Sequence, residues 1–392
     1  MTEFRILHSI HDIDAESWDA LWPERYPFTR HAFLAALEDS GSVGGDSGWK
    51  VSHLLAYENG RCCAALPLFE KSHSWGEYVF DWAWADAWQR YGLAYYPKLV
   101  CAIPFTPVVG PRLGLADHVG PDQIAAAALN FLRQYAVDIG ASSAHILFPD
   151  AASLGALQTE NVFRRSGYQY HWFNRGYQNF DDFLAEFQSR KRKNLRKERQ
   201  KIADGGIEFV EKDGHQASAD DWREFYFLYQ RTYAKRSGHG GYLGAGFFAD
   251  IAHALPNNVV LLQAKNLGKT IAAALFFRDE STLYGRYWGT IEEIDGLHFE
   301  TCYYRGIDYA IRHGLQRFDS GAQGEHKIQR GFSPQRTSSL HWIAEPGFAS
   351  AIETFCRNEE REIHRWLEEA REALPFRADI SLPDFDSLYT AK

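Results

Sequence analysis

The chain has 392 residues, a formal net charge of −9 and an aromatic share of 15%. This length is more than one hydrophobic core usually fills, so two domains are predicted. The acidic balance excludes a protein that wraps DNA over a broad surface, and no run of 18 apolar residues offers a membrane span. The five cysteines show no metal-ligand spacing and the first residues resemble no signal peptide, so we expect reduced thiols, no metal site and a cytoplasmic location.

Two segments half a chain apart have nearly the same pattern. Residues 54–69 and 261–277 each contain an apolar run, a turn with Asn and Gly, and a second apolar run that is rich in Ala and ends in Phe. Such a pattern is typical of a β-hairpin whose strands are mostly buried. The sequence therefore predicts two hairpins of similar build.

The elements around the two hairpins repeat as well. A helical pattern precedes each hairpin, at 31–38 and at 222–235. An amphipathic helix and a short strand follow each one: helix 124–135 with strand 145–148 in the first half, and helix 297–313 with a strand that begins near 317 in the second half. We therefore predict two α/β domains of one plan, at 1–178 and 179–392, with chance similarity as the alternative. A final helix, 349–373, ends before Pro375 because proline cannot continue a helix.

The segment 189–201 carries eight positive charges and one negative charge. Its residues favour a helix, in which Arg192 and Arg196, or Lys193 and Lys197, lie one turn apart and repel each other. An anionic partner would offset this repulsion. The alternative is a solvated basic face without a partner.

A search for common catalytic motifs finds neither a G-x-S-x-G nucleophile turn nor an H-E-x-x-H metal motif. Two glycine-containing segments remain. Segment 236–246 holds five glycines after an aromatic helix, so it either approaches a ligand with its backbone or simply bends. Segment 317–332 leaves a strand and brings acidic, basic and imidazole groups close together in sequence, which is typical of loops with acid–base chemistry but also of salt-bridged surface turns.

The chain resembles a family of predicted N-acyltransferases associated with peptidoglycan biosynthesis or recognition, within the GNAT superfamily and related to the Fem-type aminoacyltransferases. The segments that carry the resemblance are 29–38, 103–107, 189–201, 287–289, 297–304 and the D-S-G-A-Q-G-E-H-K stretch at 319–327. The resemblance implies an α/β fold with mixed sheets, made of two tandem GNAT-like (acyl-CoA N-acyltransferase-like) domains. It also implies an acyltransferase, which we place among those that transfer groups other than aminoacyl groups.

One departure from the superfamily concerns the acyl donor. Members that use acetyl-CoA hold its pyrophosphate with a [QR]-x-x-G-x-[GA] turn, whereas the corresponding segment 291–300 has one glycine and four carboxylates. Because carboxylates repel a pyrophosphate, aminoacyl-tRNA becomes more attractive than acyl-CoA as the donor, and no cofactor is certain. The expected partners are a small-molecule amine or nucleotide-linked substrate, with tRNA as a further possibility.

The transfer needs a proton acceptor and positive charge near the developing oxyanion. Lys327 is predicted to contact the oxyanion or a phosphate, while Asp319, Glu325 or His326 relays the proton and Glu300 is a weaker candidate. The residues predicted to bind phosphate or line the cleft are Arg192, Lys193, Arg196, Arg236, Arg330, Tyr287, Trp288 and Tyr303. The alternative function is a non-catalytic GNAT-like protein that binds a cell-envelope precursor or tRNA.

Overall fold

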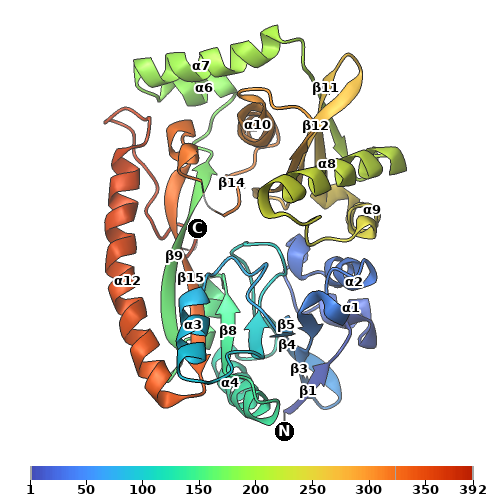
Figure 1. Cartoon of the computed structure of the whole chain (residues 1–392), viewed down its shortest axis with the longest axis vertical. Coiled ribbons are helices and arrows are strands. Elements are labelled where there is room, and N and C mark those ends of the chain that lie inside the picture. Colours follow the sequence, from blue (N-terminus) through green and yellow to red (C-terminus); the bar gives the residue numbers. More distant parts are fainter. Residues whose placement is uncertain (1, 323, 391–392) are drawn as a thin grey trace. The chain divides into compact units, whose positions relative to one another are not determined.

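The computed structural model describes residues 2–322 and 324–390, so Gln323 of the 319–327 motif lies outside the described residues (Figure 1). The chain forms two compact units. The first contains Met1–Tyr168, Arg336–Leu367 and Phe385–Lys392, and the second contains Gln169–Gln335 and Glu368–Asp384. The domain boundary expected at 178/179 stays a prediction. The chain first passes from one compact unit to the other between residues 168 and 169, and it returns to the first unit at Arg336.

The first unit is built on mixed β-sheet. One set of strands has the order β15-β8-β6-β5-β2 and a second has the order β1-β3-β4-β7. The strands are β1 (Glu3–Leu7), β2 (Trp49–Val51), β3 (His53–Glu58), β4 (Arg61–Leu66), β5 (Leu68–Lys71), β6 (Lys98–Cys101), β7 (Gly114–Leu115), β8 (Ser143–Leu147) and β15 (Ser333–Ile343), which enters from the second unit. Pro67, which has no N–H group, separates β4 from β5, and its carbonyl accepts a hydrogen bond from the Ala102 N–H.

The helices of the first unit pack apolar faces on these strands. They are α1 (Ala15–Asp19), α2 (His31–Asp39), α3 (Trp82–Arg90), α4 (Pro121–Asp138), α5 (Ala151–Leu157) and the first part of α12 (Pro346–Glu372). Leu129 and Leu132 of α4 share a core with Leu99 of β6 and Ile146 of β8. The helices predicted at 31–38, 124–135 and 349–373 are confirmed.

The second unit contains a sheet with the order β10-β11-β12-β13-β14-β9. Its strands are β9 (Phe163–Phe173), which begins in the first unit, β10 (Glu208–Asp213), β11 (Val259–Asn266), β12 (Lys269–Arg278), β13 (Thr282–Thr290) and β14 (Arg317–Asp319). Its helices are α6 (Phe180–Ala185), α7 (Ser189–Asp204), α8 (Ala219–Ser237), α9 (Ala245–Ala254), α10 (Leu297–Phe299) and α11 (Arg305–Arg312). A π-helical segment, Glu300–Tyr304, joins α10 to α11.

The internal repeat predicted from the sequence is confirmed at the two hairpins. Strands β3 and β4 pair antiparallel around Asn59 and Gly60, and β11 and β12 pair antiparallel around Leu267 and Gly268. All four turn residues have positive φ, between 48° and 78°, which matches a two-residue hairpin turn. In each unit a helix then leads into a parallel pair, β6 with β8 and β13 with β14. The predicted mixed α/β architecture is therefore confirmed.

One segment breaks the likeness between the units. Residues 72–97 separate β5 from β6 and include α3, whereas only residues 279–281 separate β12 from β13. No element was predicted within this insertion. Among the described residues, no helix combines the length and the apolar character that crossing a membrane requires.

Candidate functional site

The site begins where two parallel strands of the second unit separate. Strands β13 and β14 pair only from Thr282–Arg317 to Tyr284–Asp319. Just beyond this point, Arg286 donates from Nη2 to Asp319 Oδ2 at 2.7 Å and from Nη1 to Oδ1 at 3.2 Å. Burial favours a raised pKa for Asp319, but the Arg286 guanidinium outweighs it and holds the pKa well below its usual range. Asp319 is therefore a buried, permanently ionised partner of Arg286.

Lys327 lies under the turn that follows β14. Its side chain is buried, and Nζ donates to the carbonyl oxygens of Ser320, Gly321 and Ala322 at 3.0, 2.9 and 3.2 Å. Burial lowers the pKa of Lys327 to about 7. Since an ammonium group has three donors, all of them are used within the fold. Its predicted contact with an oxyanion stays a prediction.

Glu300 lies at the start of the π-helical segment and is also buried. It accepts hydrogen bonds from Arg199 Nη2 and Arg305 Nε, each at 2.9 Å, and Arg199 also contacts Asp308 at 2.6 Å. These ion pairs fasten α7 to the π-helical segment. The predicted role of Glu300 in proton transfer stays a prediction.

Arg330 anchors the same helix at a second point. Its Nη2 lies 3.0 Å from an oxygen of Glu198 on α7, and its guanidinium carbon lies 3.4 Å from the centre of the Phe299 ring. Tyr304 donates a short hydrogen bond to Glu198 as well. Arg330 is 7% exposed, so most of its surface faces protein and not solvent.

A pocket of about 500 Å³ opens beside these residues within the second unit. Its lining comes from α8, the end of β13 and the segment that leads into α10: Arg231, Thr232, Lys235, Arg236, Trp288, Thr290, Ile291, Glu292, Glu293, Ile294, Asp295, Leu297 and His298. The cations lie on α8 and the carboxylates on the opposite segment. Of the predicted residues, Arg236 and Trp288 line this pocket, while Tyr287 and Tyr303 are buried.

His298 is a pocket residue that the sequence reasoning missed. Its ring centre lies 5.2 Å from that of Trp288 and 5.3 Å from that of Tyr303. Burial, together with the nearby charges of His326 and Arg236, lowers the pKa of His298 to about 3, so the imidazole is neutral at neutral pH. The only signal for His298 in the sequence is its place as the second residue of the helix predicted at 297–313, which follows Gly296.

His326, a predicted proton relay, lies next to this group. Its Nε2 is 2.9 Å from Tyr303 Oη, and its ring centre is 6.1 Å from that of His298. Burial and the Lys327 charge lower the pKa of His326 to about 4. Glu325, the remaining candidate, is exposed. The structure thus brings His326, Tyr303 and His298 together, and separates Asp319 and Glu300 into ion pairs of their own.

The basic segment is helical, as predicted, and forms α7. Its cations divide into two groups. Arg196 pairs with Asp181 at 2.7 Å, Arg199 pairs with Glu300, and Lys201 pairs at 2.7 Å with Asp295 on the pocket rim. Across residues 2–322 and 324–390, no ion pair forms at Arg190, Lys191, Arg192, Lys193 or Lys197, although Lys191 donates a hydrogen bond to Gln329 at 2.5 Å. Arg192 and Lys193 are therefore available for the predicted phosphate contacts, whereas Arg196 already has an acidic neighbour.

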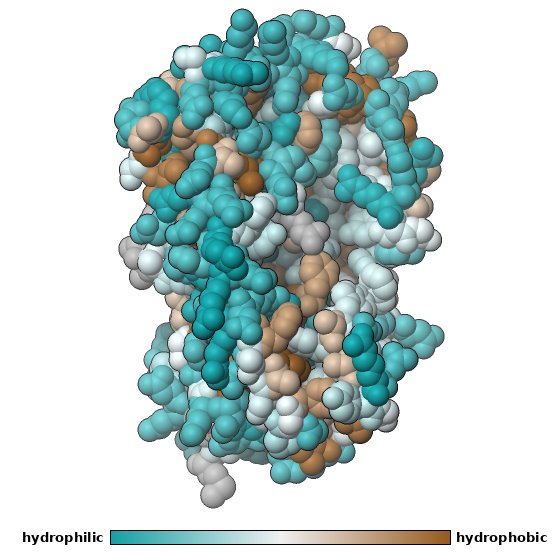
Figure 2. Space-filling view, turned by 60° about the vertical axis from the view of Figure 1, so that its left-hand side comes forward, coloured by the Kyte–Doolittle hydropathy of each residue, from teal (hydrophilic) through white to brown (hydrophobic). Residues whose placement is uncertain are grey.

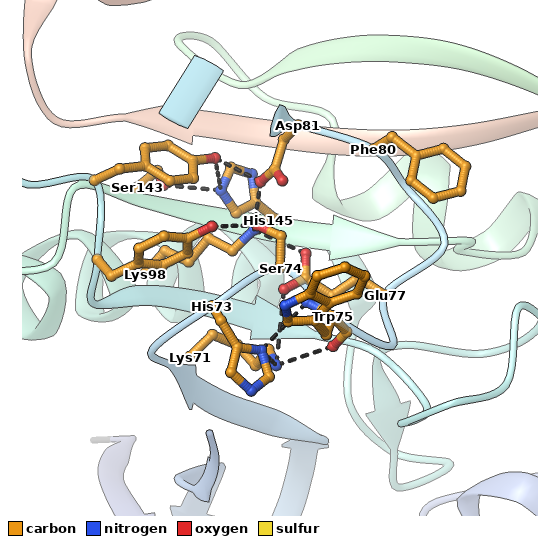
Figure 3. Close-up of polar contacts among 12 residues, drawn as sticks. Lys71, His73, Ser74, Trp75, Glu77, Phe80, Asp81, Lys98, Ser143 and His145 are labelled. Carbon is orange, nitrogen blue, oxygen red and sulfur yellow. Dashed lines mark hydrogen bonds and ion pairs between the residues drawn. The ribbon is translucent and has the colours of Figure 1, made fainter. Parts of the chain in front are cut away.

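A second charged cluster lies in the first unit, where no functional residue was predicted (Figure 3). Lys98 Nζ donates to Ser74 Oγ and Glu77 Oε2, each at 2.8 Å, and makes a short hydrogen bond to Asp81. Lys71 lies 3.7 Å from the centre of the Trp49 ring and 3.9 Å from Glu77. Burial raises the pKa of Glu77 to about 7 and lowers the pKa of Lys71 to about 7.

Two histidines extend this buried cluster. Tyr95 donates to Asp81 at 2.6 Å, and its hydroxyl lies 3.5 Å from His145 Nε2. The Nδ1 atoms of His145 and His341 are 2.7 Å apart, so one of them carries the shared proton. Burial holds the pKa of both imidazoles well below its usual range. The cluster is an ion and hydrogen-bond network inside the protein.

Comparisons with known proteins show what the whole chain is similar to. The model of the FemAB-like family, described as peptidoglycan biosynthesis/recognition, matches residues 9–378. The structure of FemX is similar over 90% of this chain and 100% of its own, with a TM-score of 0.51 at 13% identity. L-PGS from Bacillus licheniformis is similar over 87% of this chain and 96% of its own, with a TM-score of 0.52 at 12% identity. No curated protein matches the chain. The predicted α/β class with mixed sheets is confirmed by the strands and helices of both units, and the two solved structures agree with it in fold alone.

Proposed function

Because the chain belongs to the FemAB-like family of peptidoglycan biosynthesis/recognition, we propose that it transfers an acyl or aminoacyl group onto an amine acceptor of the cell envelope. The observation that carries this proposal is the pocket of about 500 Å³ in the second unit. It combines a neutral imidazole, His298, with the exposed guanidinium of Arg236 and the ring of Trp288. A base, a cation and an aromatic surface are the groups that acyl transfer to an amine requires.

His298 has the proton-transfer role in this proposal. The amine nitrogen forms a bond to the donor carbonyl carbon and must lose a proton, which the neutral imidazole accepts. The bond from that carbon to the donor oxygen or sulfur then breaks, and the imidazolium returns the proton to the leaving group. The charge of Arg236 contributes to the low pKa of His298. An anionic donor bound at Arg236 offsets that charge and makes His298 a stronger base when the donor is in place.

The donor is proposed to be aminoacyl-tRNA in preference to acyl-CoA. Three carboxylates, Glu292, Glu293 and Asp295, line the pocket at the segment where a coenzyme pyrophosphate would need N–H donors and positive charge. The unpaired cations of α7 supply positive charge outside the pocket instead, and Lys201 links that helix to the rim through Asp295.

The test is a transfer assay with purified protein, an amine acceptor and either aminoacyl-tRNA or acyl-CoA, with the product followed by mass. We expect a product with aminoacyl-tRNA that is lost in His298→Gln. Since phosphate contacts release counterions, binding of tRNA is expected to weaken steeply with salt. Transfer from acyl-CoA alone contradicts the donor assignment, and unchanged activity of His298→Gln contradicts the role of His298.

One observation favours a second candidate, a non-catalytic protein that binds a cell-envelope precursor or tRNA. Asp319, Glu300 and Lys327 all use their polar atoms within the fold. A duplicated fold can keep its binding surfaces after its chemistry is lost. In that case tRNA or precursor binds with the same salt dependence, and neither donor yields a product.

A further inference from the structure

The charged side chains that line the pocket of the second unit are only partly paired. Lys235 of α8 forms an ion pair with Glu293 on the opposite segment. Asp295, also on that segment, pairs with Lys201 of α7 at 2.7 Å. Figure 2 shows a mostly hydrophilic surface at the top of the view, where α7 lies. Two of the three carboxylates of the pocket are thus already matched with a cation.

Glu292 is the third carboxylate, and no cation is paired with it. It is exposed and lines the pocket. The hydroxyl of Thr290 accepts the Glu292 N–H at 3.2 Å and donates to the Glu292 carbonyl oxygen at 2.7 Å, which fixes the backbone at this point. Within residues 2–322 and 324–390, the side chains of Glu292 and Arg236 form neither an ion pair nor a hydrogen bond. A carboxylate and a guanidinium of one pocket are therefore open to a ligand that carries both charges.

We infer that Glu292 binds the α-ammonium group of an aminoacyl donor and selects donors in which this amine is free. The inference rests on the function proposed for the pocket, in which Arg236 holds the anionic part of the donor. The two open charges of the pocket then contact the two charged groups of one ligand. A donor whose amine is blocked leaves Glu292 without a partner and binds less tightly.

The attacking amine of the acceptor does not fit the same position. A carboxylate stabilises the ammonium form of an amine and raises its pKa, whereas the attacking nitrogen must be neutral to form a bond to the donor carbonyl carbon. The α-ammonium group of the donor takes no part in bond formation and keeps its protons during transfer. Contact with Glu292 therefore strengthens donor binding without hindering the proton transfer to His298.

The test measures binding without transfer. One probe is an adenosine monophosphate whose 3′-amino group carries glycine through an amide bond, which makes it an unreactive copy of the end of aminoacyl-tRNA. The other probe is the same compound with the glycine amine acetylated. At about pH 6 the free amine is protonated, so acetylation removes one positive charge. By titration calorimetry with the full chain, we expect the free-amine probe to bind about tenfold more tightly.

Equal affinities of the two probes, or no binding of either, overturn the inference. Because neither probe can transfer its glycine, the result does not depend on catalysis. A preference for the free amine together with no product in the transfer assay supports the role of Glu292 and contradicts the transfer function. The failure of one proposal is thereby distinguished from the failure of the other.

Variants assign the preference to one carboxylate. Glu292→Gln keeps the size of the side chain and removes its charge, so the preference is expected to fall to about twofold or less. Glu224→Gln, at an exposed position of α8 outside the pocket lining, is the matched control and retains the preference. Both variants should melt at the wild-type temperature because both side chains are exposed. A preference that survives in Glu292→Gln, or that is lost only in Glu293→Gln, contradicts the assignment.

Discussion

The two units each gather cations, carboxylates and imidazoles, but they use them in opposite ways. In the first unit, Lys98, Glu77 and Asp81 are buried and form ion pairs with one another. In the second unit, Arg236 and His298 line an open pocket and have no comparable partners among the described residues. Perturbed ionisable groups therefore mark a functional site only where the groups also reach a cavity. Buried networks perturb the same groups for structural reasons.

The largest expected effect is the loss of Lys98. Lys98→Met leaves the buried Asp81 without its cation and leaves Glu77 with only the more distant Lys71, so we expect the free energy of unfolding to fall by about 3–5 kcal/mol. Urea unfolding measures this change. The matched control is Lys50→Met, which removes an ion pair between a 60% exposed lysine and Glu70 and changes stability by about 0.5 kcal/mol or less. Similar values for both variants would show that the first-unit cluster does not stabilise the fold.

The second effect concerns the pocket. If His298 accepts the proton of the attacking amine, His298→Gln lowers the turnover number about a hundredfold, with little change in melting temperature because the ring lies at a pocket wall. His253→Gln, on the exposed side of α9, is the control and retains full activity. A parallel loss of turnover and melting temperature would instead assign His298 a structural role like that of the first-unit histidines.

The third prediction concerns the pH dependence of stability that the buried imidazoles of both units cause. The pKa of His53 in the first unit and of His171 in the second is lowered by burial to about 3. The unfolded chain takes up these protons below about pH 6.5 and the folded chain does not, so stability is lost as the pH falls from 6.5 towards 4. Each such histidine contributes a slope of about 1.4 kcal/mol per pH unit in this range.

Urea unfolding at a series of pH values measures that slope. Glu77 acts in the opposite direction, because its raised pKa contributes stability at low pH that is lost as the pH rises towards 7. Glu77→Gln should therefore steepen the acid loss of stability. A stability that is flat between pH 6.5 and 4.5 in both proteins would contradict neutral buried histidines.

The smallest expected effect is on phosphate binding. Arg236→Gln removes one pocket cation, so donor affinity should fall about tenfold and the slope of log affinity against log salt should decrease by about one. Arg223→Gln is the matched control, since Arg223 is an exposed arginine of the same helix that pairs with Asp220. Filter binding of tRNA across a salt series distinguishes them. Equal slopes for the two variants would remove Arg236 from the phosphate site.

The fold was largely predictable because its signals are local. Each hairpin shows two apolar runs around a short turn, and the basic segment consists of strong helix formers. The insertion 72–97 was missed because it has no counterpart in the second half of the chain, although Trp84 and Trp88 of its helix α3 lie one turn apart on a buried face. Its two structural charges, Glu77 and Asp81, resemble ordinary surface carboxylates in the sequence.

The site was predictable only in part because its pairings are distant in sequence. The sequence identified Asp319 and Lys327 as polar groups after a strand, but Arg286, which neutralises Asp319, comes from another strand. Neither that pairing nor the three carbonyl contacts of Lys327 has a local signal. His298 was overlooked because a lone histidine on an aromatic helix has no motif, and its significance comes from the pocket that it lines.

The path of the chain between the units has a consequence for synthesis. Strand β15 supplies residues 339–343 to pair with β8, yet these residues are translated after nearly all of the second unit. While the polypeptide is still emerging from the ribosome, β8 therefore has an open edge on that side. Such an edge can pair with other chains. Nascent protein arrested before residue 336 should thus be prone to aggregation and to early proteolysis, even where its second-unit hairpin has already formed.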